Sequence, residues 1–237
     1  MNLLQMIETG AAENGFSVTG EQAERLAQYS SAVLELNNKI NLTAIRDEKD
    51  FIERNILDSL MIAADIPGSG ASIADVGTGG GFPGIPLAVC LPEDSFVLID
   101  STRKKLDAVE EAAKPLGLEN VCYLNGRAEE RGREGEWREH FDCVVSRAVA
   151  SLRVLTELCL PLVKPGGKMI AMKSARYEEE IDEAKEAVEQ LGGRISDVQK
   201  RYLLHSDMLH VIITIEKIRK TPQKLPRSFG QIKKKPL

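Results

Sequence analysis

The chain has no long apolar run and few aromatic residues. No segment approaches the roughly 18 consecutive apolar residues that a membrane-spanning helix needs, so we expect no membrane anchor. Met1–Gly10 carries Glu8 and neither Lys nor Arg, unlike the basic start of a secretory signal peptide. We therefore expect a cytoplasmic protein, and we take a monomer as the default.

Cysteine is scarce, and its spacing excludes two common kinds of site. Cys90, Cys122, Cys143 and Cys159 stand far apart without a Cys-x-x-Cys pair. Neither a zinc site nor a disulfide framework is therefore expected, and we predict no bound metal. Three of the four lie in apolar segments, and we expect all four to serve ordinary packing in a reducing cytosol.

Acidic residues are missing from the C-terminal end. The segment Lys217–Leu237 has no Asp or Glu and eight basic residues: Lys217, Arg219, Lys220, Lys224, Arg227, Lys233, Lys234 and Lys235. Taking this charge of +8 from the net charge of −5 leaves −13 for residues 1–216. An acidic body with a basic end indicates either a polyanionic partner or a solvated terminus, and charge alone favours neither.

Hydrophobic periodicity divides the 237 residues into three expected parts. An apolar pattern at helical spacing covers Glu21–Asn41, and Asp47 followed by Asp50 is typical of a helix start. Pro67-Gly68-Ser69-Gly70 then breaks the chain. We expect an N-terminal helical extension over residues 1–66, a core domain over residues 67–218 and a basic tail over residues 219–237.

Short apolar runs alternate with longer helical stretches in the core domain, which predicts an α/β fold with a parallel sheet covered by helices on both faces. The expected strands are Ser72–Val76, Phe96–Asp100, Val121–Leu124, Phe141–Ser146 and Lys168–Met172. The expected helices are Ile85–Leu91, Arg103–Gly117, Leu152–Val163 and Glu178–Leu191. A late strand over His210–Lys217 belongs to a hairpin-like pair from about Arg194 to Ile218.

The most informative segment is Asp75–Gly84, with the sequence DVGTGGGFPG, which follows an expected strand and precedes an expected helix. Glycines without Cβ allow a tight turn and let a ligand lie against the backbone. Gly79-x-Gly81-x-x-Gly84 fits a dinucleotide site, whereas Asp75-x-Gly77-x-Gly79-x-Gly81 fits S-adenosylmethionine. Asp75 favours the second cofactor, and so do Pro83 and Pro86, which remove N–H donors from a phosphate cradle.

Polar residues at three further strand ends complete the expected site. Asp100 ends the second strand, where an acid holds ribose hydroxyls, although it also suits a helix cap. Gly126-Arg127-Ala128-Glu129 follows the third strand and would flank adenine, although Glu129 also suits the first turn of a helix. Arg147 follows the fourth strand at the edge where open α/β sheets place their sites, or it serves a structural ion pair.

Segments along nearly the whole chain resemble the RsmG family, also called GidB. They are Lys39–Thr43, Leu57–Leu60, Asp75–Pro86, Asp100-Ser101, Arg127–Glu129, Ser146–Ala150, Thr221-Pro222 through Pro226-Arg227, and Lys235–Leu237. One position departs from the family pattern, because Asn55 follows Arg54 where the family usually has His. Asn still donates and accepts hydrogen bonds, so we expect modulation at this position rather than loss.

The resemblance implies a Rossmann-like class I methyltransferase that transfers a methyl group from S-adenosylmethionine to N7 of a guanine in the 530 loop of 16S ribosomal RNA. It implies cofactor contacts at Gly77, Phe82, Asp100, Ser101, Thr102, Ala128, Glu129 and Arg147, and the pattern of the glycine loop adds Asp75 and Gly79. Arg147 is the expected catalytic residue, which would orient the cofactor carboxylate or the guanine. The implied partner is 16S ribosomal RNA or the small ribosomal subunit.

Three other functions remain open on the sequence. One is an NAD-dependent oxidoreductase on the same fold, and another is an RNA-binding or ribosome-assembly protein without turnover. The third is a methyltransferase with a small-molecule acceptor, which would leave the basic tail unexplained. We expect RNA to contact the basic tail and the patches Arg103, Lys104, Lys105, Lys173 and Arg176.

Overall fold

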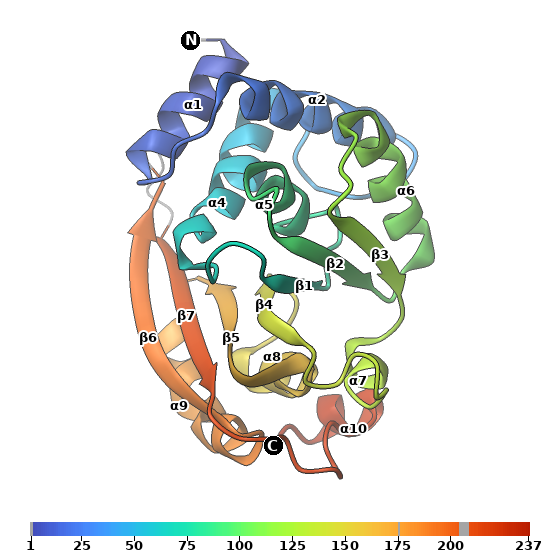
Figure 1. Ribbon diagram of the computed structural model, residues 1–237, viewed down its shortest axis with the longest axis vertical. Coiled ribbons are helices and arrows are strands. Elements are labelled where there is room, and N and C mark those ends of the chain that lie inside the picture. Colours follow the sequence, from blue (N-terminus) through green and yellow to red (C-terminus); the bar gives the residue numbers. More distant parts are fainter. Residues whose placement is uncertain (1, 175, 204–208) are drawn as a thin grey trace.

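The computed structural model describes residues 2–174, 176–203 and 209–237. Within them the chain forms a seven-stranded sheet in the order β3-β2-β1-β4-β5-β7-β6 (Figure 1). The strands are β1 (Ser72–Val76), β2 (Ser95–Asp100), β3 (Val121–Asn125), β4 (Phe141–Arg147), β5 (Val163–Lys173), β6 (Gly193–Tyr202) and β7 (Leu209–Lys217). The expected α/β sheet is confirmed.

Two features of the sheet decide where a ligand can lie. Strands β1 to β5 pair in parallel, and the strand order reverses between β1 and β4. Such a reversal leaves a crevice at the carboxyl ends of the two strands. Strand β7 is antiparallel to both β5 and β6, so the expected hairpin is confirmed, although residues 204–208 within it lie outside the described residues.

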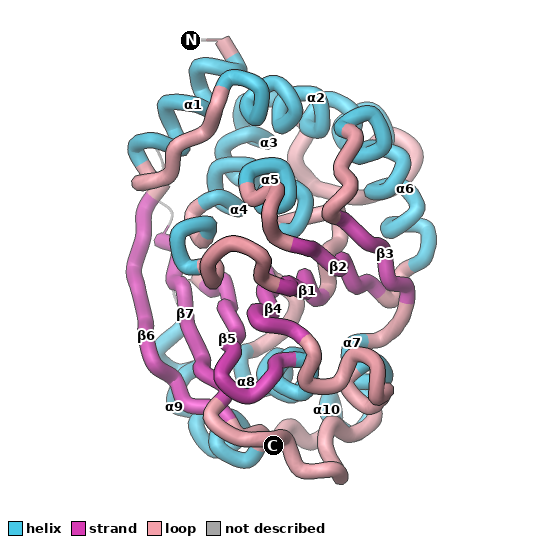
Figure 2. The backbone as a smooth tube through the Cα atoms, in the orientation of Figure 1, coloured by secondary structure: helices cyan, strands magenta, loops and turns pink. Residues whose placement is uncertain are grey.

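Helices cover both faces of the sheet (Figure 2). One face carries α1 (Leu3–Glu13), α2 (Gly20–Leu36), α3 (Glu48–Phe51), a π-helical stretch (Ile52–Leu57), α4 (Asp58–Leu60), α5 (Gly84–Cys90) and α6 (Arg103–Ala113). The other carries α7 (Ala128–Arg131), α8 (Leu152–Cys159), α9 (Tyr177–Gln190) and α10 (Phe229–Lys234). Alternate strand residues serve the two faces, as the pleat requires: Ile73 packs with the first set and Ala74 with the second.

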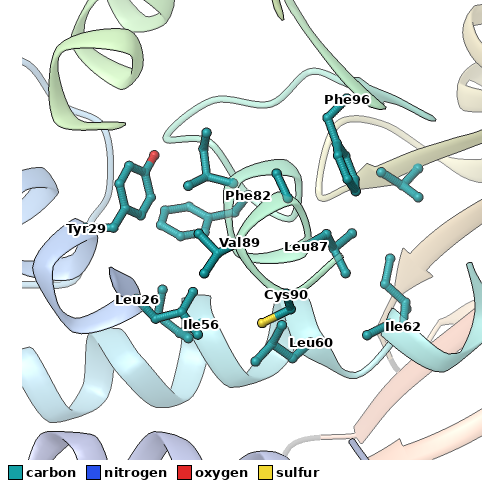
Figure 3. Packing of buried hydrophobic residues seen from close by; sticks show 14 of the residues in the cluster. Leu26, Tyr29, Ile56, Leu60, Ile62, Phe82, Leu87, Val89, Cys90 and Phe96 are labelled. Carbon is teal, nitrogen blue, oxygen red and sulfur yellow. The ribbon is translucent and has the colours of Figure 1, made fainter. Parts of the chain in front are cut away.

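The N-terminal helices share one hydrophobic core with the sheet. Leu26 and Tyr29 of α2 pack against Ile56, Leu60 and the residues of α5 (Figure 3). Residues 1–66 therefore form part of the support for β1 and its following loop. None of the described helices is long and apolar enough to cross a bilayer.

The prediction that a helix covers Glu21–Asn41 is wrong at its C-terminal end, because α2 stops at Leu36. The Asn37 side chain accepts hydrogen bonds from the backbone N–H groups of Leu42 and Thr43 and donates one to the Thr43 carbonyl. These bonds fold residues 37–43 back on themselves in place of further helical turns. The predicted helix start at Asp47 is confirmed, since its carboxylate accepts from Lys49 and Asp50 N–H.

The expected helix over Leu152–Val163 also ends early. Helix α8 stops at Cys159, a 3-10 turn covers Leu160–Leu162, and Val163 already pairs with Phe141 as the first residue of β5. Pro161 lies in that turn and cannot continue the backbone hydrogen bonding of α8. Strand β5 is consequently longer than the expected Lys168–Met172.

Residues 219–237, the expected basic tail, are folded onto the domain. Arg138 donates to the carbonyls of Thr221 and Leu225, and Arg133 donates to that of Pro226. Ile232 of α10 is fully buried beside α8. We call residues 219–237 the C-terminal segment below, because the described part is an ordered piece of the domain rather than a solvated end.

Candidate active site at the carboxyl edge of the sheet

The glycine loop after β1 turns sharply beneath the reversal in strand order. The N–H groups of Gly77 and Thr78 donate to the Ile99 carbonyl of β2. Gly77, Gly79 and Gly81 have φ angles of +74°, +57° and +84°, values that side chains other than glycine adopt at a cost. The loop therefore presents bare backbone at the edge of the sheet.

Asp75 anchors this loop from the buried interior of the domain. Its side chain is fully buried, and one carboxylate oxygen accepts from the Thr78 hydroxyl at 2.7 Å and from the Gly84 N–H at 2.9 Å. Burial raises the pKa of Asp75 to about 6, against the lowering effect of these two hydrogen bonds. Asp75 was expected to contact the cofactor, but it is not among the residues that line the cavity described next.

A cavity of about 470 Å³ opens above the loop, a size typical of small-ligand sites. Its lining includes eight of the expected cofactor residues: Gly77, Gly79, Phe82, Asp100, Ser101, Ala128, Glu129 and Arg147. Thr102 lies outside the lining and donates its N–H to Asp100. Sequence reasoning did not assign several other lining residues to the cofactor site: Leu42, Thr43, Asn55, Lys105, Val149 and Phe229.

Asp100 ends β2 in the middle of this edge. One of its carboxylate oxygens accepts from Gly79 N–H at 3.0 Å and the other from Thr102 N–H at 2.7 Å. Since each carboxylate oxygen has two lone pairs, both oxygens keep a lone pair for a ligand hydroxyl. The helix-cap alternative is not confirmed, because Thr102 is the N-cap residue of α6 and Asp100 accepts, at that helix start, only from the Thr102 N–H. The remaining lone pairs of Asp100 leave the hydroxyl-binding alternative open.

Glu129 lies at the β3 side of the cavity. It is buried in the first turn of α7, and burial raises its pKa while Arg127 and Arg133 act in the opposite sense. The preceding residues Gly126 and Arg127 come directly from the end of β3, and Gly126 N–H donates to the Asp100 carbonyl. The strand ends β2 and β3 are thereby fixed relative to each other.

Arg147 is held by three groups from the N-terminal helices. Its guanidinium donates to Asp58 at 2.5 Å, to the Asn55 side-chain oxygen at 2.8 Å and to the Arg54 carbonyl at 2.9 Å. It also lies over the ring of Phe82, with the guanidinium carbon 5.4 Å from the ring centroid. Arg147 thus makes the expected ion pair, yet its side chain remains 18% exposed and lines the cavity.

Asp58 is shared between Arg147 and a histidine of β7. Its second oxygen lies 2.7 Å from His210 Nδ1. Burial alone would raise the pKa of Asp58, but the hydrogen bond from His210 and the charge of Arg147 outweigh it and lower that pKa. Asn55, the position at which the sequence departs from the expected family pattern, accepts a hydrogen bond from Arg147 through its side-chain oxygen.

The residue after Arg147 has an unusual backbone. Ala148 adopts φ of +55°, a left-handed conformation that costs a residue with a Cβ roughly 1–2 kcal/mol. This turn places Val149 over Gly77, where a Cβ on the glycine would lie 2.4 Å from a Val149 methyl. Backbone strain of this kind is typical of functional sites, and here the strained Ala148 and the adjacent Val149 both line the cavity.

The expected RNA-contacting cations are divided by the structure. Lys217 is buried, Arg227 pairs with Glu157, and Lys173 bonds Glu180 and the Ala150 carbonyl, so these three cations are occupied internally. Lys104, Arg176, Lys220, Lys224, Lys233, Lys234 and Lys235 are exposed. The basic end from Lys217 to Leu237 therefore offers fewer cations to a phosphate backbone than its composition indicates, because Lys217 and Arg227 are used internally.

Buried thiols are likewise unavailable for chemistry. Cys90, Cys143 and Cys159 are buried and Cys122 is exposed. Burial raises the pKa of Cys90 and of Cys143 to about 12. The expectation that all four cysteines serve packing is confirmed for Cys90, Cys143 and Cys159 and is wrong for Cys122, which lies at the surface of β3. None of the four lines the cavity.

Comparison with solved structures supports the fold assignment. The chain is similar to TYW2 from M. jannaschii in complex with AdoMet, with a TM-score of 0.55, 21% identity and coverage of 69% of this chain and 76% of that one. It is also similar to NSun6 from Pyrococcus horikoshii with SFG, with a TM-score of 0.58, 15% identity and coverage of 75% and 57%. At these identities the likeness shows the methyltransferase fold alone.

Sequence comparison is more specific. The chain is 42% identical, over 100% of both proteins, to the ribosomal RNA small subunit methyltransferase G of Alkaliphilus metalliredigens. It is 41% identical to the protein of the same name from Clostridium tetani, again over 100% of both. The family model GidB, rRNA small subunit methyltransferase G, matches residues 22–204, and the chain belongs to this family.

Proposed function

We propose that this enzyme transfers a methyl group from S-adenosylmethionine to N7 of a guanine in 16S ribosomal RNA, in the 530 loop of the small subunit. The observation that carries the proposal is the single cavity that joins Gly77 and Gly79, Asp100 and Glu129 with the anchored Arg147. Family membership supplies the substrate class. A cytoplasmic location follows from a ribosomal substrate.

The residues present fit the cofactor. The open backbone of Gly79 accommodates a close approach, the free lone pairs of Asp100 suit ribose hydroxyls, and Arg147 suits a carboxylate. S-adenosylmethionine, when bound, supplies an electrophilic methyl group on a positively charged sulfur. The antiparallel β7 argues against the dinucleotide alternative, whose usual sheet is mostly parallel in the order 3-2-1-4-5-6.

The residues that line the cavity suit an acceptor that needs no base. Guanine N7 has a lone pair and loses no proton on methylation. Arg147 only donates hydrogen bonds, so it orients groups and removes no proton. The anchoring by Asp58 and Asn55 fixes its direction, and correct alignment of reacting atoms is worth roughly 7–11 kcal/mol.

The experiment that tests this function is transfer of labelled methyl from S-adenosylmethionine to naked 16S ribosomal RNA and to small subunits that lack the modification. We expect label on at least one of the two. RNA binding without label would favour the assembly-protein alternative. Tight NAD binding without a response to S-adenosylmethionine would favour the oxidoreductase.

A further inference from the structure

We propose that Phe229 of the C-terminal segment forms the wall against which the adenine ring of the cofactor stacks. The segment is then part of the cofactor site and not only a source of positive charge. This inference rests on the proposed function, because it assigns one end of S-adenosylmethionine to a named side chain.

The order of the strand ends places the adenine. The cavity runs along the carboxyl ends of β1, β2 and β3, which are neighbours in the sheet. Arg147 and the glycine loop lie at the β4 and β1 side, and Asp100 holds the ribose at the end of β2. A base attached to that ribose, on the side away from the methionine end, reaches Arg127, Ala128 and Glu129 after β3, where Phe229 also lines the cavity.

Phe229 is the aromatic residue available at that end. Two aromatic residues line the cavity within the described part of the chain, Phe82 and Phe229. Phe82 packs edge-on against Tyr29 and Phe51 and lies under Arg147, so its ring is already enclosed. Phe229 is half-buried and shares the cavity wall with the apolar residues Ile99, Ala128 and Leu158.

The ring of Phe229 is fixed before a ligand arrives. The guanidinium carbon of Arg127 lies 5.0 Å from its centroid. Two residues earlier, Arg227 bonds the fully buried Glu157 through both its backbone N–H and its side chain. Three residues later, Ile232 is buried in the core. A rigid aromatic surface loses little conformational entropy on binding, which favours affinity.

The exposed lysines near the end of the segment lie apart from this role. Lys233, Lys234 and Lys235 are exposed and do not line the cavity. Deletion of the whole segment would therefore remove a cofactor wall together with the lysines, and loss of activity would not identify an RNA contact. Single substitutions separate the two roles.

The test is calorimetric titration of wild type, Phe229→Ala, Phe229→Leu and Phe229→Tyr with S-adenosylmethionine, S-adenosylhomocysteine and adenosine. Stacking of a base on an aromatic ring contributes about 1–3 kcal/mol, so we expect Phe229→Ala to raise Kd about five- to 150-fold for all three ligands. Phe229→Leu keeps apolar packing without an aromatic face and should also weaken all three. Phe229→Tyr should stay within about twofold of wild type.

The matched control is Lys233→Ala/Lys234→Ala/Lys235→Ala, which should leave the three dissociation constants unchanged. Melting temperatures measured without ligand show whether each variant is folded. Unchanged cofactor affinity in folded Phe229→Ala and Phe229→Leu would overturn the inference, as would a loss confined to the KM for RNA. A wild type that binds none of the three ligands would instead contradict the proposed function, so the two failures are distinguishable.

Discussion

The carboxylate of Asp58 lies between the guanidinium of Arg147 and the imidazole of His210. The substitution Asp58→Asn keeps the size of the side chain but removes its charge, which weakens the interaction that positions the Arg147 guanidinium. Because small misplacements of aligned groups cost up to about 100-fold in rate, we expect kcat/KM for methyl transfer to fall about 10- to 100-fold. Steady-state kinetics on folded protein measures this.

Asp65→Asn is the matched control for Asp58→Asn. Asp65 pairs with Arg201 and its side chain is 15% exposed, against 6% for Asp58, but neither Asp65 nor Arg201 lines the cavity. This variant should lose some stability and keep its activity per folded molecule. Equal losses of activity in both variants would contradict a specific positioning role for Asp58.

Asp75 predicts a pH dependence of stability with a definite sign. Burial raises its pKa from the ordinary value of 3.8 to about 6, so the folded state holds this proton more tightly than the unfolded state does. Its contribution is fully present below about pH 4 and is lost as pH rises through about 6. Urea unfolding of wild type and Asp75→Asn between pH 4 and 7 should show this decline in wild type only; parallel curves would contradict it.

The sequence predicted which residues lie at the site better than it predicted what each of them contacts there. Gly77, Gly79, Asp100 and Arg147 follow strands in a recognisable pattern, so they could be placed at one edge from the sequence. Asp75 fits the same pattern but serves the loop from within the core. The partners of Arg147 lie 89 to 93 positions away along the chain, a separation at which local patterns carry no information.

At the scale of the element, two glycines of the loop after β1 should differ in what their substitution affects, one mainly cofactor binding and the other mainly folding stability. A Cβ at Gly81 would lie 2.1 Å from the Tyr29 hydroxyl oxygen. A Cβ at Gly79 would meet only the carbonyl oxygen of Gly77, at 3.8 Å. Gly79→Ala should cost about 1–2 kcal/mol for its left-handed backbone and mainly weaken cofactor binding. Gly81→Ala should cost clearly more stability. Chemical denaturation and cofactor titration compare them, and equal stability losses would refute this difference.

The C-terminal segment depends on a buried ion pair. Glu157 is 0% exposed, and Arg227 is its partner at 2.5 Å. Arg227→Ala leaves that carboxylate buried without its counter-charge, so we expect a loss of about 3–5 kcal/mol in the free energy of unfolding. Lys234→Ala, an exposed lysine of the same segment, should change it by no more than about 0.5 kcal/mol. Thermal unfolding measures both, and similar effects would show that the pair does not hold the segment.

Element boundaries were predictable where a local cap defines them. Asp47 is such a cap, and capping boxes at Asn2 with Gln5 and at Ser228 with Gln231 were available signals for α1 and α10. The end of α2 was not predictable from periodicity, because apolar residues continue after Leu36. The Asn37 side chain ends that helix through contacts that only the folded backbone reveals.

At the scale of the whole molecule, the order of the strands and the family membership both indicate a methyltransferase. The apolar runs predicted a parallel sheet, and the β-branched run His210–Lys217 predicted the antiparallel strand that completes it. Composition misled in one respect, since a count of basic residues does not show which of them the fold uses internally. Lys217 and Arg227 stabilise the domain, and the remaining exposed lysines are the candidates for RNA contact.

The most direct test of the account is the position of the methyl group. Small subunits that lack N7-methylguanine would be incubated with labelled S-adenosylmethionine and either wild type or Arg147→Ala, and the modified base mapped by N7-specific chemical cleavage. The account predicts cleavage at a single guanine of 16S ribosomal RNA with wild type and loss of that signal in folded Arg147→Ala. Label at another atom or base, or undiminished cleavage with Arg147→Ala, would contradict it.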